Sequence, residues 1–440
     1  YTGRPNAVIA ESINEEIENE IVAINLKLAK LAYENKIYEA GNHDVVSAVN
    51  LALDFYSQIM VGQVSAQIVG EQDREVCMNI KVRDGAEAVL TLKNVNLRGR
   101  ETPVIDIGEN ASLTLILEGE NTLSYEGIYV PKSSRLLIQG GGNLTVHVDH
   151  NNGLGIGSMS DIPYGSVWFD GEGTLRVESN GDVAIGIGGM NADEESELKF
   201  TGGNIEVISN GSKSICIGSV EGFTRIILDN CTAALSASGA DAVCIGSFNG
   251  DVDISSTAEI EMDASGSAAT GIGSLHDRGG RIAINAGKIR LIQHCMGGTA
   301  IGSMDGTMDI SIHGSEIFVY VEGTDVGGIG NYHGCGKTYV HSGVIKVSLL
   351  AANSIALGDK KGYLEISGGN IQCDLVGAVQ PVNQFGVPLF EKVIESQEPY
   401  FCRIETIEGM YQYFAESSEL IEGIHVYIPK FCIEMPLELT

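Results

Sequence analysis

The chain has 440 residues, of which 43% are apolar, with 56 Gly and 9 Pro. This composition excludes a wholly disordered chain, and the lack of a strict three-residue glycine period excludes collagen. The formal net charge of −31 disfavours nucleic acid and anionic lipid as partners, because both require a basic surface. A neutral carbohydrate, a cation or a basic partner is compatible with it, and no run of 18 apolar residues predicts insertion into a membrane.

Residues 1–75 differ from the rest of the chain and are expected to form a helical cap. Apolar residues recur there at three- and four-residue steps, as is typical of amphipathic helices. The first series is Ile13, Ile17, Ile21, Ile24, Leu28 and Leu31, and the second is Val45, Val49, Leu53, Tyr56 and Met60. The pair Gly41-Asn42 indicates a helix stop between them. These helices are also candidates for contacts between copies of the chain in a homo-oligomer.

From residue 76 to residue 379 the sequence predicts a right-handed parallel β-helix. A small residue, then Ile or Leu, then Gly recurs with the central residue at positions 156, 187, 217, 245, 272, 301, 329 and 357. Each unit holds two more strand-like segments, such as 198–204 and 205–209. Three short strands per coil of about 28 residues would stack into three parallel sheets around an apolar interior. The expected fold class is therefore all-β, a three-sheet solenoid.

Residues 380–440 lack the repeat and are expected to form a small β-rich cap or domain. The stretches 388–394, 401–407 and 424–431 have the composition of antiparallel strands. A cap is expected because an open sheet edge invites the addition of further strands.

The cysteines predict core positions rather than disulfide bonds. There are nine, with no CxxC spacing of the kind that binds zinc. Cys216 and Cys244 occupy equivalent places in successive repeats, as small buried residues would. A reducing or anaerobic setting fits this usage.

The segment GENTLSYEGIYVPKSSRLLIQGGGNLTVHVDHNNGLGIGS (119–158) resembles the GIGG-repeat region of bacterial surface proteins described as carbohydrate-binding domain-containing. It is similar to a clostridial β-helix family that binds cellulose and pectic polysaccharide and carries calcium. The resemblance covers residues 80–430 and implies a parallel β-helix, a polysaccharide partner, bound calcium and an extracellular or cell-surface location in an anaerobic bacterium. The chain departs from the pattern where Ser replaces many second glycines of GIGG.

The loops after each signature are the candidate binding edge, because stacked repeats place equivalent loops in a row. They carry polar and aromatic residues at Asp161, Asp193, Asp251, Asp277, Asp305, His276, Arg278, Tyr332 and His333. Three interpretations remain open: a solvated turn edge, a strip that binds glycan, and an enzyme site. For the last, Asp251, Asp277 and Asp305 are the candidate catalytic carboxylates. They are separated by about one coil each, and retaining glycosidases hold two carboxyl groups about 5 Å apart.

Two further features bear on ligands. Trp168, the only Trp, is either a surface platform for a sugar or a residue at the edge of the core. Calcium would need oxygen-rich loops such as 191–196, and no other cofactor is indicated. No catalytic motif is present. The leading hypothesis is an extracellular carbohydrate-binding or adhesin-type protein. The alternatives are a glycoside hydrolase or polysaccharide lyase, and a structural spacer or assembly subunit.

Overall fold

A computed structural model describes residues 57–358 with gaps at 64, 101, 149–151, 277 and 352–353. Outside this range it describes residues 37–39, 47–51, 363–366, 369–375 and the strands between 389 and 429. The first predicted helix lies outside the described residues. The second is wrong where the structure describes it, because Ser47–Asn50 and Gln58–Val61 are strands. Both pair in parallel with later strands, so sheet pairing overrides the helical spacing of Val49 and Met60.

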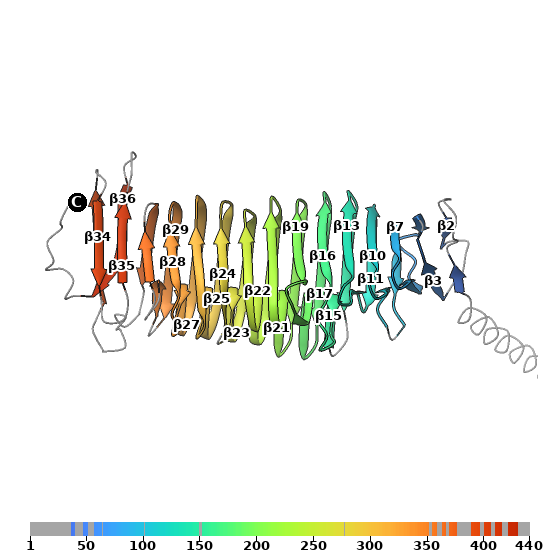
Figure 1. Ribbon diagram of the computed structural model, residues 1–440, viewed down its shortest axis with the longest axis horizontal. Helices are drawn as coiled ribbons and strands as arrows, with labels where there is room; N and C mark the ends of the chain where they lie inside the picture. The colour runs from blue at the N-terminus through green and yellow to red at the C-terminus, as the bar shows by residue number, and fades with distance from the viewer. Residues whose placement is uncertain are drawn as a thin grey trace, which may run out of the picture.

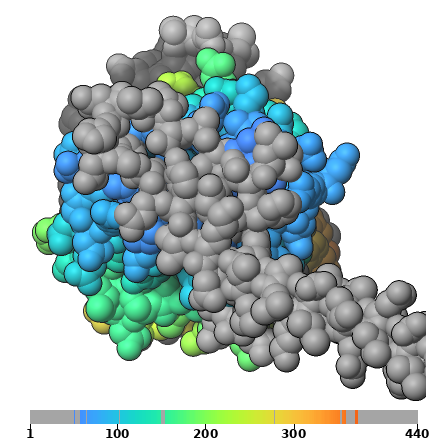
Figure 2. All heavy atoms as spheres, turned by 90° about the vertical axis from the view of Figure 1, so that its right-hand side faces the viewer, coloured from blue at the N-terminus to red at the C-terminus, as the bar shows by residue number. Residues whose placement is uncertain are grey.

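The described chain is a parallel β-solenoid whose coils follow one another along a single axis (Figure 1). Seen along that axis, later coils lie behind earlier ones (Figure 2). Each coil contributes one strand to each of three parallel ladders, which we call faces 1, 2 and 3. The three-sheet arrangement predicted from the repeat is confirmed.

Face 1 contains the strands that follow the signature of each coil. They are β2 (Ser47–Asn50), β4 (Ser65–Val69), β7 (Glu87–Lys93), β10 (Ser112–Glu118), β13 (Arg135–Gly140), β16 (Ser166–Gly171), β19 (Glu197–Thr201), the last parts of β21 (Lys213–Asp229) and β22 (Thr232–Ser256), β24 (Gly279–Ile284), β26 (Thr307–Ile312), β28 (Lys337–Val340) and β31 (Tyr363–Ile366).

Face 2 contains the next strand of each coil. Its members are β5 (Val76–Cys77), β8 (Asn96–Arg98), β11 (Glu120–Tyr125), β14 (Asn143–Val148), β17 (Thr174–Asn180), β20 (Asn204–Asn210), the first parts of β22, β23 (Glu259–Ser274), β25 (Lys288–Ser303) and β27 (Ser315–Asn331), then β29 (Gly343–Ala351) and β32 (Asn370–Leu375).

Face 3 carries the repeated signature. It is built from β1 (Ile37–Glu39), β3 (Gln58–Val61), β6 (Asn79–Val82), β9 (Ile105–Ile107), β12 (Ile128–Tyr129), β15 (Asn152–Ser158), β18 (Val183–Ala192), parts of β21, β22, β23, β25 and β27, and β30 (Ile355–Leu357). The central residues pair directly, Ile156 with Ile187, then Ile187 with Ile217, and so on to Leu357. The ladder extends back through Ile59 to Tyr38, well before the first signature.

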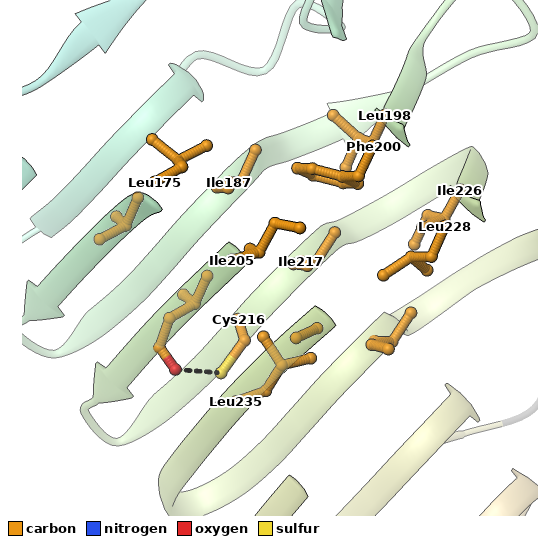
Figure 3. Packing of buried hydrophobic residues seen from close by; sticks show 14 of the residues in the cluster. Leu175, Ile187, Leu198, Phe200, Ile205, Cys216, Ile217, Ile226, Leu228 and Leu235 are labelled. Atoms are coloured by element: carbon orange, nitrogen blue, oxygen red, sulfur yellow. Dashed lines mark hydrogen bonds between the residues drawn. The ribbon is translucent and has the colours of Figure 1, made fainter. Parts of the chain in front are cut away.

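The interior is one continuous apolar core, because alternate residues of every face point inward. Strand β10, for example, alternates half-buried and buried residues until its exposed last residue. Figure 3 shows Ile187 and Ile217 stacked from neighbouring coils, with Cys216 among the aliphatic side chains. Cys216 and Cys244 are both fully buried, and the six cysteines whose side chains the structure describes are free. Their expected core position is confirmed.

A buried Ser that replaces the second glycine of the signature forms a hydrogen bond near its loop: Ser247, Ser274 and Ser303 donate to loop carbonyls, whereas Ser219 bonds to the Thr224 hydroxyl. Ser219, Ser247, Ser274 and Ser303 are all 0% exposed. The hydroxyl of Ser247 donates to the Val220 carbonyl at 3.2 Å, and that of Ser303 donates to the His276 carbonyl at 3.0 Å. A buried polar group needs such a partner, so each Ser ties the loop of its own or a neighbouring coil to face 3.

After the solenoid, four strands pair mainly antiparallel. Strand β33 (Leu389–Ser396) pairs with β36 (Ile421–Pro429), and β34 (Tyr400–Glu405) pairs with β35 (Met410–Ala415). Strand β35 also pairs in parallel with β31 of face 1. The expectation of antiparallel strands in this tail is met by these pairs.

Candidate functional site

The loops that follow the signatures are tied to the backbone of the neighbouring coil. The His276 amide donates to the Phe248 carbonyl at 3.0 Å, and the His333 amide donates to the Met304 carbonyl at 2.6 Å. Thr307 likewise donates to the carbonyl of Arg278, whose side chain is exposed. His276 is half-buried. The loops thus stack in a row, as the repeat predicts.

Asp251 makes a backbone contact in this row, and its predicted partner Asp277 falls outside the described residues. Asp251 lies beside Phe223 on one side and accepts a hydrogen bond at 2.9 Å from the Gly279 amide on the other. A carboxylate that accepts an amide in this way stabilises a turn. Asp161 and Asp305 are exposed, and Asp277 lies outside the described residues.

Asp193 is engaged in a local ion pair. Its carboxylate lies 2.8 Å from the Lys132 ammonium and accepts from the Glu195 amide at 3.0 Å. Burial alone would raise the pKa of Asp193, but the hydrogen bonds from Lys132, the Glu195 amide and Ser196 outweigh it and lower the pKa. This carboxylate of loop 191–196, the expected calcium loop, thus has partners both within the loop and at Lys132 of an earlier coil. Among the described residues, no three or more His, Cys, Asp and Glu side chains gather as a metal site.

Tyr332 is buried, so the prediction that it lies on an exposed binding strip is wrong. Its side chain is 1% exposed, and its hydroxyl donates to Asp325 at 3.4 Å. A Cβ built on Gly327 would lie 3.4 Å from the Tyr332 Cβ, so the two residues are close neighbours. Among the aromatic and histidine residues of the predicted strip, only His333 remains fully exposed.

A second apolar cluster, separate from the main core, lies at equivalent places of earlier coils. It consists of Ile185, Ile215, Val220, Val243, Phe248 and Leu275. One row lies two residues before the central Ile of each signature. It runs Ile185, Ile215, Val243, Thr270, Thr299, Gly327. The other row directly follows the signature and contains Val220, Phe248 and Leu275, and Tyr332 stands at the equivalent position of a later coil. The apolar residue after each signature was the sequence signal for this cluster.

Trp168 points outward from β16 but is not an open platform. The guanidinium carbon of Arg135 lies 4.3 Å from the centre of its ring, and the Lys199 ammonium lies 5.4 Å away. These residues come from the strands on either side, β13 and β19. Cations over an indole ring are held by its negative face, so Trp168 is already occupied by side chains of its own chain.

The outer surface of face 2 holds a groove that sequence reasoning did not single out. It measures about 350 Å³. Two small side chains, Ala234 and Ser236, lie at its centre, on one strand between larger neighbours. The walls are Glu206 and Ile208 on one side and Glu261 and Asp263 on the other, with Arg290 and Ile292 beyond.

A second groove of about 540 Å³ adjoins the first and shares Arg290 and Ile292 with it. Its outward side chains include Phe318 and Tyr320 on β27, with Lys288, Lys346 and Ser348 around them. Tyr320 is 37% exposed, and His294 meets it edge-on with ring centres 6.2 Å apart. We call the two together the face 2 groove.

The pairing register of the strands aligns the side chains of the face 2 groove in two straight rows. One row runs Glu206, Ala234, Glu261, Arg290, Phe318, Lys346, and the other runs Ile208, Ser236, Asp263, Ile292, Tyr320, Ser348. Strands lie about 4.8 Å apart, so six strands give a surface roughly 24 Å long. The Glu206 carboxylate also forms an ion pair with Arg176, whose Nη1 lies 2.7 Å from its Oε2.

Fold and surface together define an acidic parallel β-solenoid with a grooved outer sheet. Comparison with protein-family models, with curated proteins and with solved structures finds no match for this chain. In the part of the chain that the structure describes, no helix is long and apolar enough to cross a membrane.

Proposed function

We propose that this protein is an extracellular carbohydrate-binding or adhesin-type solenoid that holds an extended polysaccharide in the face 2 groove. The observation that carries the proposal is the pair of straight side-chain rows over six neighbouring strands. In this proposal the coils wind right-handed, as parallel β crossovers almost always do. The segments before and after the solenoid cover its two ends.

The chemistry of the groove suits a sugar chain. Carboxylates at Glu261 and Asp263 and the guanidinium of Arg290 can bind hydroxyl groups, while Phe318 and Tyr320 can stack on the apolar faces of sugar rings. The small side chains of Ala234 and Ser236 leave room for a ring between them. The resemblance to carbohydrate-binding surface proteins supports the same ligand class.

Filling the groove tests the proposal directly. Ala234→Trp would occupy the centre of the groove, and binding to insoluble and soluble polysaccharides would be measured by pulldown and affinity electrophoresis. The matched control is Ala283→Trp, which places the same side chain on the outer surface of face 1, between Ser255 and Ser311. We expect at least a tenfold loss of affinity in Ala234→Trp alone. Equal binding by both variants contradicts the proposal.

A second candidate function is glycoside hydrolysis, favoured by the position of Glu206 and Glu261. They lie in one row with only Ala234 between them, so their backbones are about 10 Å apart at two strand spacings. Inverting glycosidases hold their carboxyl groups roughly 6.5–9.5 Å apart. Mass spectrometry of each bound polysaccharide distinguishes the two functions. Shortened products that disappear with Glu261→Gln would establish an enzyme, and intact ligand would establish binding alone.

A further inference from the structure

Two neighbouring strands in the middle of the face 2 groove present opposite charges. The carboxylates of Glu259, Glu261 and Asp263 lie on the outward side of β23. Lys288 and Arg290 lie on the outward side of the next strand, β25. The register places Glu259 opposite Lys288 and Glu261 opposite Arg290. Since neighbouring strands lie about 4.8 Å apart, an acidic strand lies directly beside a basic one.

The opposite charges on these two strands do not neutralise one another. In the part of the chain that the structure describes, no ion pair joins Glu259 to Lys288 or Glu261 to Arg290. The Lys288 ammonium instead lies 5.9 Å from the centre of the Phe318 ring, on the strand beyond β25. An aromatic ring attracts a cation to its face, so Lys288 has a partner on the side away from β23. Charged groups of both signs are therefore available to a ligand.

These charges divide the face 2 groove into an acidic half and a basic half. The acidic half consists of Glu261 and Asp263, and the basic half consists of Lys288, Arg290 and Lys346. Glu261 and Lys346 stand three strand spacings apart in one row, a separation of about 14 Å. The whole chain has 27 Lys and Arg against 58 Asp and Glu. The basic half therefore departs from the average surface of the protein.

We infer that the groove binds a zwitterionic glycan, a chain whose sugars carry amino groups as well as carboxylates or other anionic groups. The inference rests on the function proposed above and narrows its ligand. The acidic half would bind the ammonium groups, and the basic half would bind the anionic groups. Charge-assisted hydrogen bonds of this kind are about twice as strong as those between neutral groups. Phe318 and Tyr320, which lie beside the cations, would stack on the sugar rings that bear the anionic groups.

The two halves also select against other glycans. A polyanion that spans the groove meets the carboxylates of the acidic half, a polycation meets the cations of the basic half, and like charges that face each other oppose binding. A neutral chain removes water from charged groups without pairing them, which costs binding energy. The remaining acidic surface has little influence, because charges more than about 8 Å away are largely screened at physiological ionic strength. The charges within the groove therefore decide the ligand.

Binding to four polymers with the same β-1,4-linked backbone tests the inference. Carboxymethyl chitosan carries both charges, chitosan carries amino groups alone, carboxymethyl cellulose carries carboxylates alone, and hydroxyethyl cellulose is neutral. Equilibrium binding of the full chain to each immobilised polymer would be measured at pH 6 and at physiological ionic strength, where amino and carboxyl groups are both charged. We expect carboxymethyl chitosan to bind about tenfold more tightly than hydroxyethyl cellulose and more tightly than either singly charged polymer. Ala234→Trp, which fills the groove, should abolish this binding.

Charge variants assign the two halves. Glu261→Gln is expected to weaken the binding of chitosan and of carboxymethyl chitosan by about fivefold, the upper range for one exposed ion pair, and to leave carboxymethyl cellulose bound no more weakly. Lys288→Gln should do the reverse, with the loss confined to the two polymers that carry carboxylates. The matched controls are Glu172→Gln and Lys213→Gln, which change exposed charges outside the groove and should bind every polymer as the wild type does.

The outcomes separate this inference from the proposed function. Equal affinity for carboxymethyl chitosan and hydroxyethyl cellulose, with both lost in Ala234→Trp, would overturn the zwitterionic ligand and leave glycan binding in the groove intact. The same holds if Glu261→Gln and Lys288→Gln bind all four polymers as their controls do. If no polymer binds in a way that depends on Ala234, the inference and the proposed function both fail. Urea midpoints equal to that of the wild type would show that the charge variants are folded, as expected for exposed side chains.

Discussion

Gly218 lies against Gly246 on the neighbouring coil so closely that a Cβ on Gly218 would be 1.7 Å from the Gly246 carbonyl oxygen. Gly218 also has a φ of 146°, a conformation that residues with a Cβ rarely adopt. The glycine of the signature is therefore required twice, by its own backbone and by its neighbour. This explains why Gly is kept at this place while the residues around it change.

We expect Gly218→Ala to destabilise the protein by more than about 3 kcal/mol, because about 1–3 kcal/mol of backbone strain adds to a similar cost of overpacking. Gly141→Ala is the control, since a Cβ there would meet nothing within 4 Å. Its effect should stay within about 0.5 kcal/mol. Urea unfolding followed by circular dichroism measures both, and equal midpoints for the two variants would refute this account of the signature.

Tyr332 and Tyr320 provide a matched pair of a buried and an exposed tyrosine. Tyr332→Ala should cost about 3 kcal/mol or more, as truncation of a buried aromatic residue does, because its ring is 1% exposed. Tyr320→Ala, in the face 2 groove, should cost less than about 1 kcal/mol and reduce polysaccharide affinity instead. Thermal unfolding and pulldown of both variants check this. A stable Tyr332→Ala variant with impaired glycan binding would restore Tyr332 to the binding edge.

The ion network on face 2 makes a defined contribution to stability that depends on pH. Glu178 accepts from Nε of Arg176 at 2.9 Å and lies 2.9 Å from Nδ1 of His147. The hydrogen bond from Arg176 is the main cause that lowers the pKa of Glu178, with a smaller contribution from His147, against the opposing effect of burial. A carboxyl with a lowered folded pKa stabilises the protein above its unfolded pKa, and this contribution is lost as the pH falls through the folded pKa.

Glu178→Gln is therefore expected to cost about 1 kcal/mol at pH 7. The difference from the wild type should begin to shrink below the ordinary glutamate pKa of about 4.3 and should vanish as the pH falls through the lowered folded pKa of Glu178. Glu172→Gln, a change at an exposed carboxylate, is the control and should show no such trend. Urea midpoints across this pH range give the answer. A cost that stays constant with pH would show that the charge of Glu178 is irrelevant to stability.

The described cysteines should react with thiol reagents very unequally. A hydrogen bond with Cys216, together with burial, raises the pKa of Cys244, and burial raises the pKa of Cys231 to about 11. Since the thiolate is the reactive form, iodoacetamide at pH 8 should label exposed Cys335 and leave Cys216 and Cys244 unmodified until the protein unfolds. Peptide mapping by mass spectrometry reads this out. Rapid labelling of Cys216 in the native protein would contradict its burial.

The solenoid could be predicted from the sequence because the residues that pair between coils recur at a regular spacing. Ile187, Ile217 and Ile245 fall at the coil spacing, and the structure pairs them directly. The face 2 groove could not be predicted in this way. Its depth comes from Ala234 lying between Glu206 and Glu261, a comparison across three coils that no local pattern reveals.

The prediction that Tyr332 is exposed failed for a related reason. Loop composition suggested exposure, but Tyr332 directly follows the signature, and Val220, Phe248 and Leu275 at the equivalent position of earlier coils are buried too. The second predicted helix failed because strands can meet a three- and four-residue spacing by chance, and pairing of Ser47–Asn50 with β4 decides the outcome. In both places a contact with another coil outweighs the local sequence.

The in-register ladders also determine which changes of length the chain can accept. Because each coil contacts mainly the coil before and the coil after it, duplication of one whole unit would lengthen the rod by about 4.8 Å and leave every existing neighbour relation intact. Insertion of a single residue within a strand would move the following inward-facing side chains of that strand to the outer surface, and the outward-facing ones to the core. The solenoid can therefore be lengthened only by whole coils. Coils added within the face 2 groove would lengthen the groove as well.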